Sequence, residues 1–95
     1  MTIPTDEHFQ ESAELFRLLG DCSRAKVFWL LCHSEECVAD IAELTGMTSP
    51  AISHHLRLLR KSGLIQSSRK GKEVYYKASS SPSAQVLHDA LEKIM

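Results

Sequence analysis

Apolar and polar positions follow a helical period over most of this chain and a period of two in one short region. Where apolar residues recur every three or four positions, the pattern predicts helices. These segments are residues 5–19, 21–32, 37–45, 49–62 and 82–95. In residues 64–68 and 74–78 the apolar positions alternate instead, which predicts two strands joined by a turn at residues 69–72.

Residues at the ends of these segments support the helical interpretation. Asp21 and Thr48 or Ser49 are good N-caps, and Pro50 suits a first helical turn. Gly20, Gly46 and Gly63 follow three of the helices, where glycine commonly ends a helix. The apolar run of residues 27–32 would also suit a buried strand, but the upstream cap and the nearby charges favour a helix.

The order of these elements predicts one domain over residues 1–95, mainly α with a small β-hairpin. Residues 38–62 form a helix, a tight turn and a second helix, which is a helix-turn-helix, and residues 64–78 form a hairpin wing behind it. We therefore expect a winged helix-turn-helix with the order α-α-α-α-β-β-α. Residues 1–20 and 83–95 carry more apolar surface than a small core needs, so we expect them to form the interface of a homodimer.

Charge is divided unequally along the sequence, although the net charge of the 95 residues is only −1. Residues 1–46 contain nine acidic and three basic side chains, whereas residues 47–78 contain seven basic side chains and one acidic side chain. The second region therefore carries +6 (7 − 1), which is typical of a surface that binds a polyanion. We expect the partner to be double-stranded DNA.

Several other classes of protein are disfavoured by the composition. No apolar run approaches the roughly 20 residues of a membrane span, and the N-terminal residues do not resemble a signal peptide. Three cysteines do not suggest a disulfide framework. We expect a cytoplasmic protein, and we expect no enzyme, because no nucleophile with an oxyanion-stabilising loop and no phosphate-binding loop is visible.

One face of the segment at residues 49–62 combines short polar side chains at its start with cations toward its end. Such a helix suits the major groove of DNA. We expect base edges to be read near the N-terminus and phosphates to be held by the cations of this helix and of the wing. The candidate residues are Thr48, Ser49, Ser53, His54, Arg57, Lys61, Arg69, Lys70 and Lys72. The alternative is a winged-helix module that binds protein and never DNA.

Four segments of the chain, in order and spacing, resemble the ArsR/SmtB family of bacterial repressors over roughly residues 13–91. The segments are Leu19-Gly-Asp21 with Arg24, Val27 and Leu30-Leu31, then Glu36–Ala42, then Ser49–Leu56 with Leu59 and Gly63–Ile65, and finally Lys70–Tyr76. The resemblance implies a dimeric winged-helix repressor that leaves its DNA operator when a metal ion or an oxidant binds.

The resemblance also implies a place for the sensor. Cys37 and Asp40 match positions of the metal-binding box in the family's third helix, and His8 could add a ligand from the N-terminal arm, but Ala39 replaces a second cysteine. Cys32 lies five residues before Cys37 and is a further candidate ligand. A soft ion such as Cd(II), Pb(II), As(III) or Zn(II) would suit these thiolates.

Two alternatives remain open for these cysteines: a thiol redox switch, or small buried residues in a repressor with no metal sensing. The family's zinc site in the last helix has no match at Ser80–Ser83. His88 and Glu92, four positions apart in that helix, could hold a metal ion, but such a pair is more typical of an ordinary surface.

Overall fold

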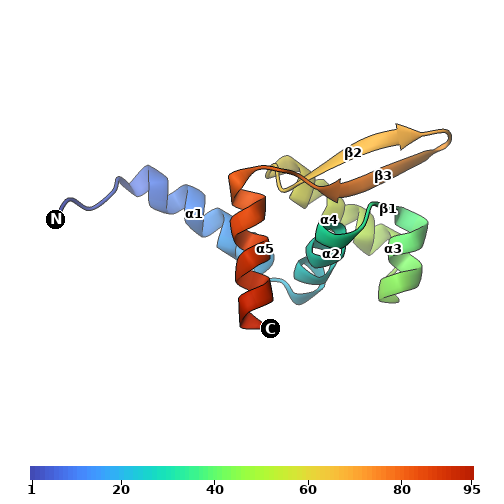
Figure 1. Ribbon diagram of the computed structural model, residues 1–95, viewed down its shortest axis with the longest axis horizontal. Helices are drawn as coiled ribbons and strands as arrows, with labels where there is room; N and C mark the ends of the chain where they lie inside the picture. Colours follow the sequence, from blue (N-terminus) through green and yellow to red (C-terminus); the bar gives the residue numbers. More distant parts are fainter.

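Five helices and three strands make up the protein in a computed structural model that describes all 95 residues (Figure 1). The fold confirms the winged helix-turn-helix predicted from the sequence. The elements are α1 (Asp6–Leu19), α2 (Cys22–His33), β1 (Glu36–Cys37), α3 (Val38–Thr45), α4 (Ser49–Lys61), β2 (Ile65–Lys70), β3 (Glu73–Ala78) and α5 (Pro82–Ile94).

Four helices are capped at the N-terminus by a residue whose side chain accepts a hydrogen bond from the backbone N–H three residues later. The capping residues are Thr5, Asp21, Thr48 and Ser81. Each bond satisfies one of the donors that the first helical turn leaves unpaired. At the other end of α3, Gly46 has a φ of 73°, a left-handed conformation that closes the helix and that glycine adopts without strain. Local sequence therefore determines where these helices start and stop.

The core lies where α2, α3 and α4 meet and where α4 continues into the wing. Its largest fully buried side chains are Phe28, Ile41, Ile52, Leu59, Leu64 and Val27. Each such side chain contributes about 1.5–3 kcal/mol through its removal from water. The helix-turn-helix is thus held by contacts with α2 and not only by its own turn.

The wing contains a strand that the sequence pattern does not reveal. The sheet has the order β1-β3-β2, and Glu36 and Cys37 of β1 pair with Tyr76 and Tyr75 of β3. The pattern places these two residues in a polar connection and at the start of a helix. Two residues are too few to produce an alternating pattern, so only the tertiary structure reveals this strand. Cys37 is both the end of β1 and the N-cap of α3.

Helix α1 extends away from the rest of the molecule and has no buried residue (Figure 1). Phe9 and Phe16 on α1 are exposed by 51% and 67%. An apolar groove of about 260 Å³ lies between α1 and α5 and is lined by Ser12, Leu15, Phe16, Pro82, Ser83, Val86 and Leu87. None of the helices is long and apolar enough to cross a membrane. The two terminal helices therefore leave apolar surface uncovered, as the sequence predicted.

One histidine is part of the interior. His55 is 8% exposed, and its Nδ1 accepts a hydrogen bond of 3.2 Å from Nε of Arg24, which also donates to the carbonyl of Leu18. Burial, followed by the charge of Arg24, lowers the pKa of His55. The imidazole is therefore uncharged at neutral pH, and its hydrogen bond with Arg24 joins α2 to α4.

We expect His55 to make stability depend on pH. Its pKa is lower in the folded than in the unfolded protein, so the unfolded state takes up the proton first as the pH falls below about 6.5. The free energy of unfolding should fall between pH 7.5 and 5.5, by at most about 1.4 kcal/mol per pH unit for this group. Urea unfolding at both pH values measures it. His55→Gln, which keeps an acceptor for Arg24, should flatten the dependence, and the exposed control His8→Gln should not. Equal pH dependence in all three proteins would refute this role.

Candidate nucleic-acid interface and ligand sites

Helix α4 has a buried face and a polar face. Ile52, His55, Leu56 and Leu59 are buried, whereas every sequence-predicted contact on this helix is exposed. Those exposed residues are Ser49, Ser53, His54, Arg57 and Lys61, and Thr48 caps the helix by accepting a hydrogen bond of 3.3 Å from the Ala51 amide. Because the apolar face of α4 packs into the core, the polar face of the same helix is exposed to solvent.

A groove of about 570 Å³ runs between α4 and the wing. Ser53, Leu56, Arg57, Arg60, Lys61 and Tyr76 line it. Three of these six residues are cations, which gives the groove a strongly positive potential. Arg57 is oriented by a hydrogen bond of 3.0 Å between its Nη2 and Nδ1 of His54.

Arg60 lines the groove as well and is a further candidate contact, beyond those predicted from the sequence. It lies seven residues after Ser53 and three after Arg57, so helical spacing alone could have placed it on the same side of α4.

The cations of the wing do not have equal surroundings. Nζ of Lys70 forms an ion pair with Glu35, on the connection after α2, and lies 5.3 Å from the ring centroid of Tyr75. The hydrogen bond from Lys70 lowers the pKa of Glu35. Arg69 and Lys72 are exposed and take part in no ion pair. A phosphate that binds Lys70 must compete with Glu35. At Arg69 or Lys72 it meets no such competing ion pair.

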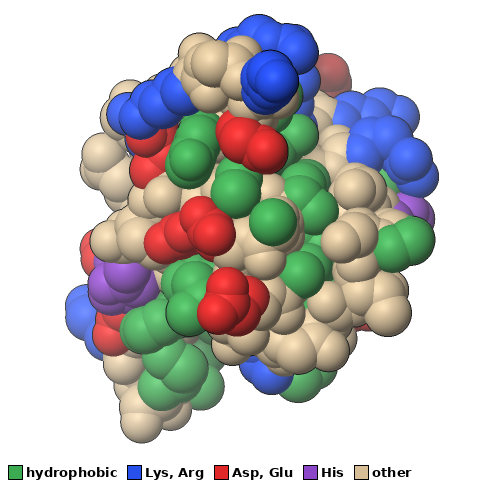
Figure 2. Space-filling view, turned by 90° about the vertical axis from the view of Figure 1, so that its right-hand side faces the viewer, with side chains coloured by type: hydrophobic (Ala, Val, Ile, Leu, Met, Phe, Trp, Pro, Cys, Tyr) green, Lys and Arg blue, Asp and Glu red, His purple; other side chains and the backbone are tan.

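Figure 2 looks onto the end of the molecule where the wing tip and α3 lie. Lys and Arg side chains occupy the top of this face and its upper right, and acidic side chains lie among hydrophobic ones in the middle. The acidic residues of α3 include Asp40 and Glu43. The charge separation along the sequence is therefore also a separation in space.

The predicted thiol site is not assembled as a ligand set. All three cysteines are free; Cys22 is exposed, Cys32 is half-buried and Cys37 is 5% exposed. Burial and the charge of Glu92 raise the pKa of Cys32 to about 11, so this thiol is protonated at neutral pH. Cys37, Cys32 and Asp40 do not form a group whose ligand atoms lie close together, and neither does His8 with them.

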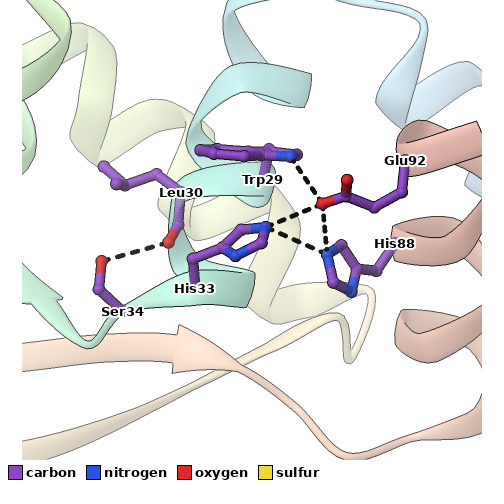
Figure 3. Close-up of polar contacts among 6 residues, drawn as sticks. All are labelled: Trp29, Leu30, His33, Ser34, His88 and Glu92. Carbon is purple, nitrogen blue, oxygen red and sulfur yellow. Dashed lines mark hydrogen bonds and ion pairs between the residues drawn. The ribbon is translucent and has the colours of Figure 1, made fainter. Parts of the chain in front are cut away.

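Another trio does come together, between the end of α2 and α5 (Figure 3). Nε2 of His33, Nε2 of His88 and Oε1 of Glu92 lie 3.0 Å (His33–Glu92), 3.1 Å (His88–Glu92) and 3.2 Å (His33–His88) apart. Nε1 of Trp29 donates to the same Glu92 oxygen over 3.1 Å. These bonds lower the pKa of Glu92, that from His33 most. The sequence favours a surface pair for His88 and Glu92, and no pattern in it connects them with His33.

Comparison with known proteins places this geometry in a family. Residues 21–67 match the family described as "Bacterial regulatory protein, arsR family". The chain is 35% identical over 77 residues to the transcriptional repressor SdpR of Bacillus subtilis, covering 81% of each. It is 42% identical over 62 residues to the cadmium resistance transcriptional regulatory protein CadC of Listeria innocua, covering 64% of this chain and 52% of CadC.

Among solved structures, the fold is similar to the homodimeric winged helix-turn-helix DNA-binding domain Mb0332 of Mycobacterium bovis. The TM-score is 0.78 at 27% identity, over 99% of this chain and 88% of that one. The chain spans about half to three fifths of the length of several curated relatives that it matches. These relatives are transcriptional regulators and not enzymes. The helix-turn-helix, the wing and the sequence similarity agree: the chain belongs to the ArsR family of bacterial regulatory proteins.

Proposed function

We propose that the protein is a homodimeric, cytoplasmic transcriptional repressor that binds double-stranded operator DNA. The observation that carries the proposal is the basic groove between α4 and the wing, beside a helix face of small polar side chains. A duplex presents phosphates on either side of its major groove, so a helix with cations around it can enter between them.

Each part of this surface has a different task. The side chains of Ser49, Ser53 and His54, near the N-terminus of α4, are short, so they let the helix come close to the base edges. There they can donate or accept hydrogen bonds. Arg57, Arg60 and Lys61 would hold phosphate in the groove where α4 faces the wing, and Arg69 and Lys72 would hold it farther out on the wing. Thr48 and Lys70 would contribute less, because the cap and the ion pair with Glu35 already occupy their side chains.

The competing function is a winged-helix module that binds another protein. A docking helix of that kind exposes apolar anchors. On α4 the large apolar side chains of Ile52, Leu56 and Leu59 are buried and Leu58 is half-buried. Apart from Pro50, the exposed side chains of this helix are polar or basic, which favours DNA.

We expect DNA binding to weaken steeply with salt. A dimer with roughly 6–10 phosphate contacts should lose about 10³–10⁵ in affinity between 50 and 200 mM salt. Fluorescence anisotropy with a labelled duplex would measure this. Lys72→Ala should weaken binding to all sequences alike, and the salt slope should fall by about one for each phosphate that the variant no longer neutralises.

Lys70→Ala is the matched control within the wing. It should have a smaller effect than Lys72→Ala, because Lys70 gives up Glu35 to reach a phosphate. Ser53→Ala or His54→Ala should instead change which sequence is preferred. A salt response that is flat in the parent protein would contradict the DNA proposal.

The apolar surface of α1 and α5 supports a homodimer. Phe16 is 67% exposed and Val86 is 64% exposed, and both line the groove between these helices. Leu87, by contrast, is 6% exposed and belongs to the core of one protomer. Substituting Leu87 would therefore damage the fold whether or not a partner covers α5, and Val86 is the better probe.

Phe16→Glu and Val86→Glu should shift the protein from dimer to monomer at micromolar concentration, because each places a charge in the proposed interface. Sedimentation velocity would measure the shift. Leu44→Glu is the matched control: Leu44 is 61% exposed on α3, away from α1 and α5, so its substitution should leave the dimer intact. A parent protein that sediments as a folded monomer would exclude this interface.

A sensor at Cys37 would make the repressor respond to thiophilic metals or oxidants. Cys37 opens α3, which packs against α4, and pairs through β1 with the wing. A bond formed at its sulfur could therefore shift both DNA-contacting elements, and a few kcal/mol of preference for the shifted state suffices. The name of the relative CadC is consistent with a metal ligand. Because Cys37 is buried, its ligands must gather by movement of α3 or by help from Cys32, Asp40 or His8.

We expect Cys37→Ser to bind DNA but to be no longer released by Cd(II), As(III) or mild oxidant. Cys32→Ser should have a weaker response than the parent, and Cys22→Ser, on an exposed thiol at the start of α2, should behave as the parent. Operator release followed by anisotropy is the measurement. A normal response of Cys37→Ser to every inducer active on the parent would exclude this sensor.

A further inference from the structure

The trio of His33, His88 and Glu92 lies apart from α4, from the wing and from Cys37. His33 is the last residue of α2, and His88 and Glu92 are one turn apart on α5. Their side chains are 42%, 28% and 44% exposed, so solvent reaches them. Figure 3 shows the two imidazoles and the carboxylate pointing toward one another from the two helices.

Hydrogen bonds can account for at most two of the three contacts in this arrangement. The three atoms make three mutual contacts of 3.0–3.2 Å. An Nε2 atom carries at most one hydrogen and an ionised carboxylate carries none, so at most two hydrogens serve three contacts. If both imidazoles donate to Glu92, the N–H groups of His33 and His88 face each other. If neither Nε2 atom carries a hydrogen, the lone pairs of the two Nε2 atoms face each other instead. A cation between the three atoms would satisfy all of them at once.

We propose that His33, His88 and Glu92 bind a divalent first-row transition metal ion, with Zn(II) the best fit. Zinc bonds to nitrogen and oxygen of about 2.0–2.1 Å place tetrahedral ligands about 3.3–3.4 Å apart. The three observed separations need to open by only a few tenths of an ångström to reach that value. Two imidazoles and one carboxylate suit zinc better than Ca(II) or Mg(II), which prefer oxygen ligands, or As(III), which prefers thiolates.

The surroundings hold this ligand set in place. Trp29 donates to the ligating oxygen of Glu92, and its ring lies 4.1 Å from that of His33, centroid to centroid. A cavity of about 500 Å³, lined in part by His33 and His88, opens beside them and leaves room for a water molecule as a fourth ligand. Such outer contacts orient ligands and raise metal affinity.

An ion at this site would tie the end of α2 to α5. His33 is followed directly by the connection that carries Glu35 and β1, which contact the wing, and α5 belongs to the proposed dimer interface. The ion would therefore couple the interface to the DNA-contacting half. This regulatory consequence rests on the proposed function, whereas the metal site does not.

Cobalt(II) titration of the purified protein tests the site without DNA. We expect one ion per protomer, the visible absorption of tetrahedral cobalt, no near-ultraviolet thiolate charge-transfer band, and displacement of the cobalt by zinc. His33→Gln, His88→Gln and Glu92→Gln should each weaken binding more than about 100-fold. Trp29→Phe should weaken it by about 10–100-fold, as expected for an outer contact.

Asp89→Asn, an exposed acidic residue on α5, and Cys22→Ser, an exposed thiol, are the matched controls and should bind as the parent does. Thermal unfolding keeps the test interpretable: zinc should raise the Tm of the parent but not of His88→Gln, whose Tm without metal should stay near that of the parent. Equal cobalt affinity in the parent and in His88→Gln, or a cobalt spectrum that His33→Gln and Glu92→Gln leave unchanged, would overturn the site.

Operator binding with and without zinc then tests the consequence. Zinc should change the affinity of the parent for DNA at least about tenfold and leave His88→Gln unchanged, a coupling in the range usual for allosteric sites. If zinc binds and DNA affinity does not change, the regulatory role is overturned and the site stands. A protein that binds no DNA at all would contradict the proposed function, and the cobalt spectrum would still decide on the site.

Discussion

The packing of the apolar face of α4 against α2 and α3 is the interaction on which the rest of the structure depends. Ile52, Leu56 and Leu59 belong to one buried cluster with Phe28 and Ile41. Once these side chains are inside, the rotation of α4 about its axis is fixed, because the helical period leaves only one face for solvent. The same packing sets the start of β2, since Leu64 and Ile65 continue the cluster directly after α4.

Elements determined by neighbouring residues were predictable from the sequence. The helix caps at Asp21 and Thr48, the left-handed Gly46 and the hairpin of the wing all follow from local patterns, and the structure agrees with each. The polar face of α4 was predictable for the same reason, and Arg60 could have been included by helical spacing alone. The residue roles assigned to that face remain predictions.

Features that depend on distant residues were not predictable. Strand β1 has two residues and exists only because β3 lies beside it. Lys70 and Glu35 are 35 positions apart, and His33 and His88 are 55 apart. No periodicity connects such pairs. The resemblance to a repressor family implies a sensor at Cys37, whereas the side chains that the structure brings together lie on α2 and α5.

The two proposed ligand sites differ in chemistry and in access. Cys37 is a soft donor in the interior, and an incoming ion or oxidant must move packed structure to reach it. The histidine and glutamate trio consists of harder donors at the surface, already close to the separations a metal needs. A protein with both would distinguish metals by donor type and by how much rearrangement each requires.

The two-residue strand has a further consequence, for the lengths of chain that this fold tolerates. Only Ser34, Glu35, Glu36 and Cys37 lie between α2 and α3, and the last two are paired with β3. One inserted residue would shift the register by one position, turning Cys37 outward and Glu36 inward. This connection therefore tolerates substitutions but not insertions or deletions. The hairpin tip at Gly71 and Lys72 can lengthen by whole residue pairs without moving either of its ends. Insertions and deletions among descendants of this sequence should therefore occur at the wing tip and not in the connection between α2 and α3.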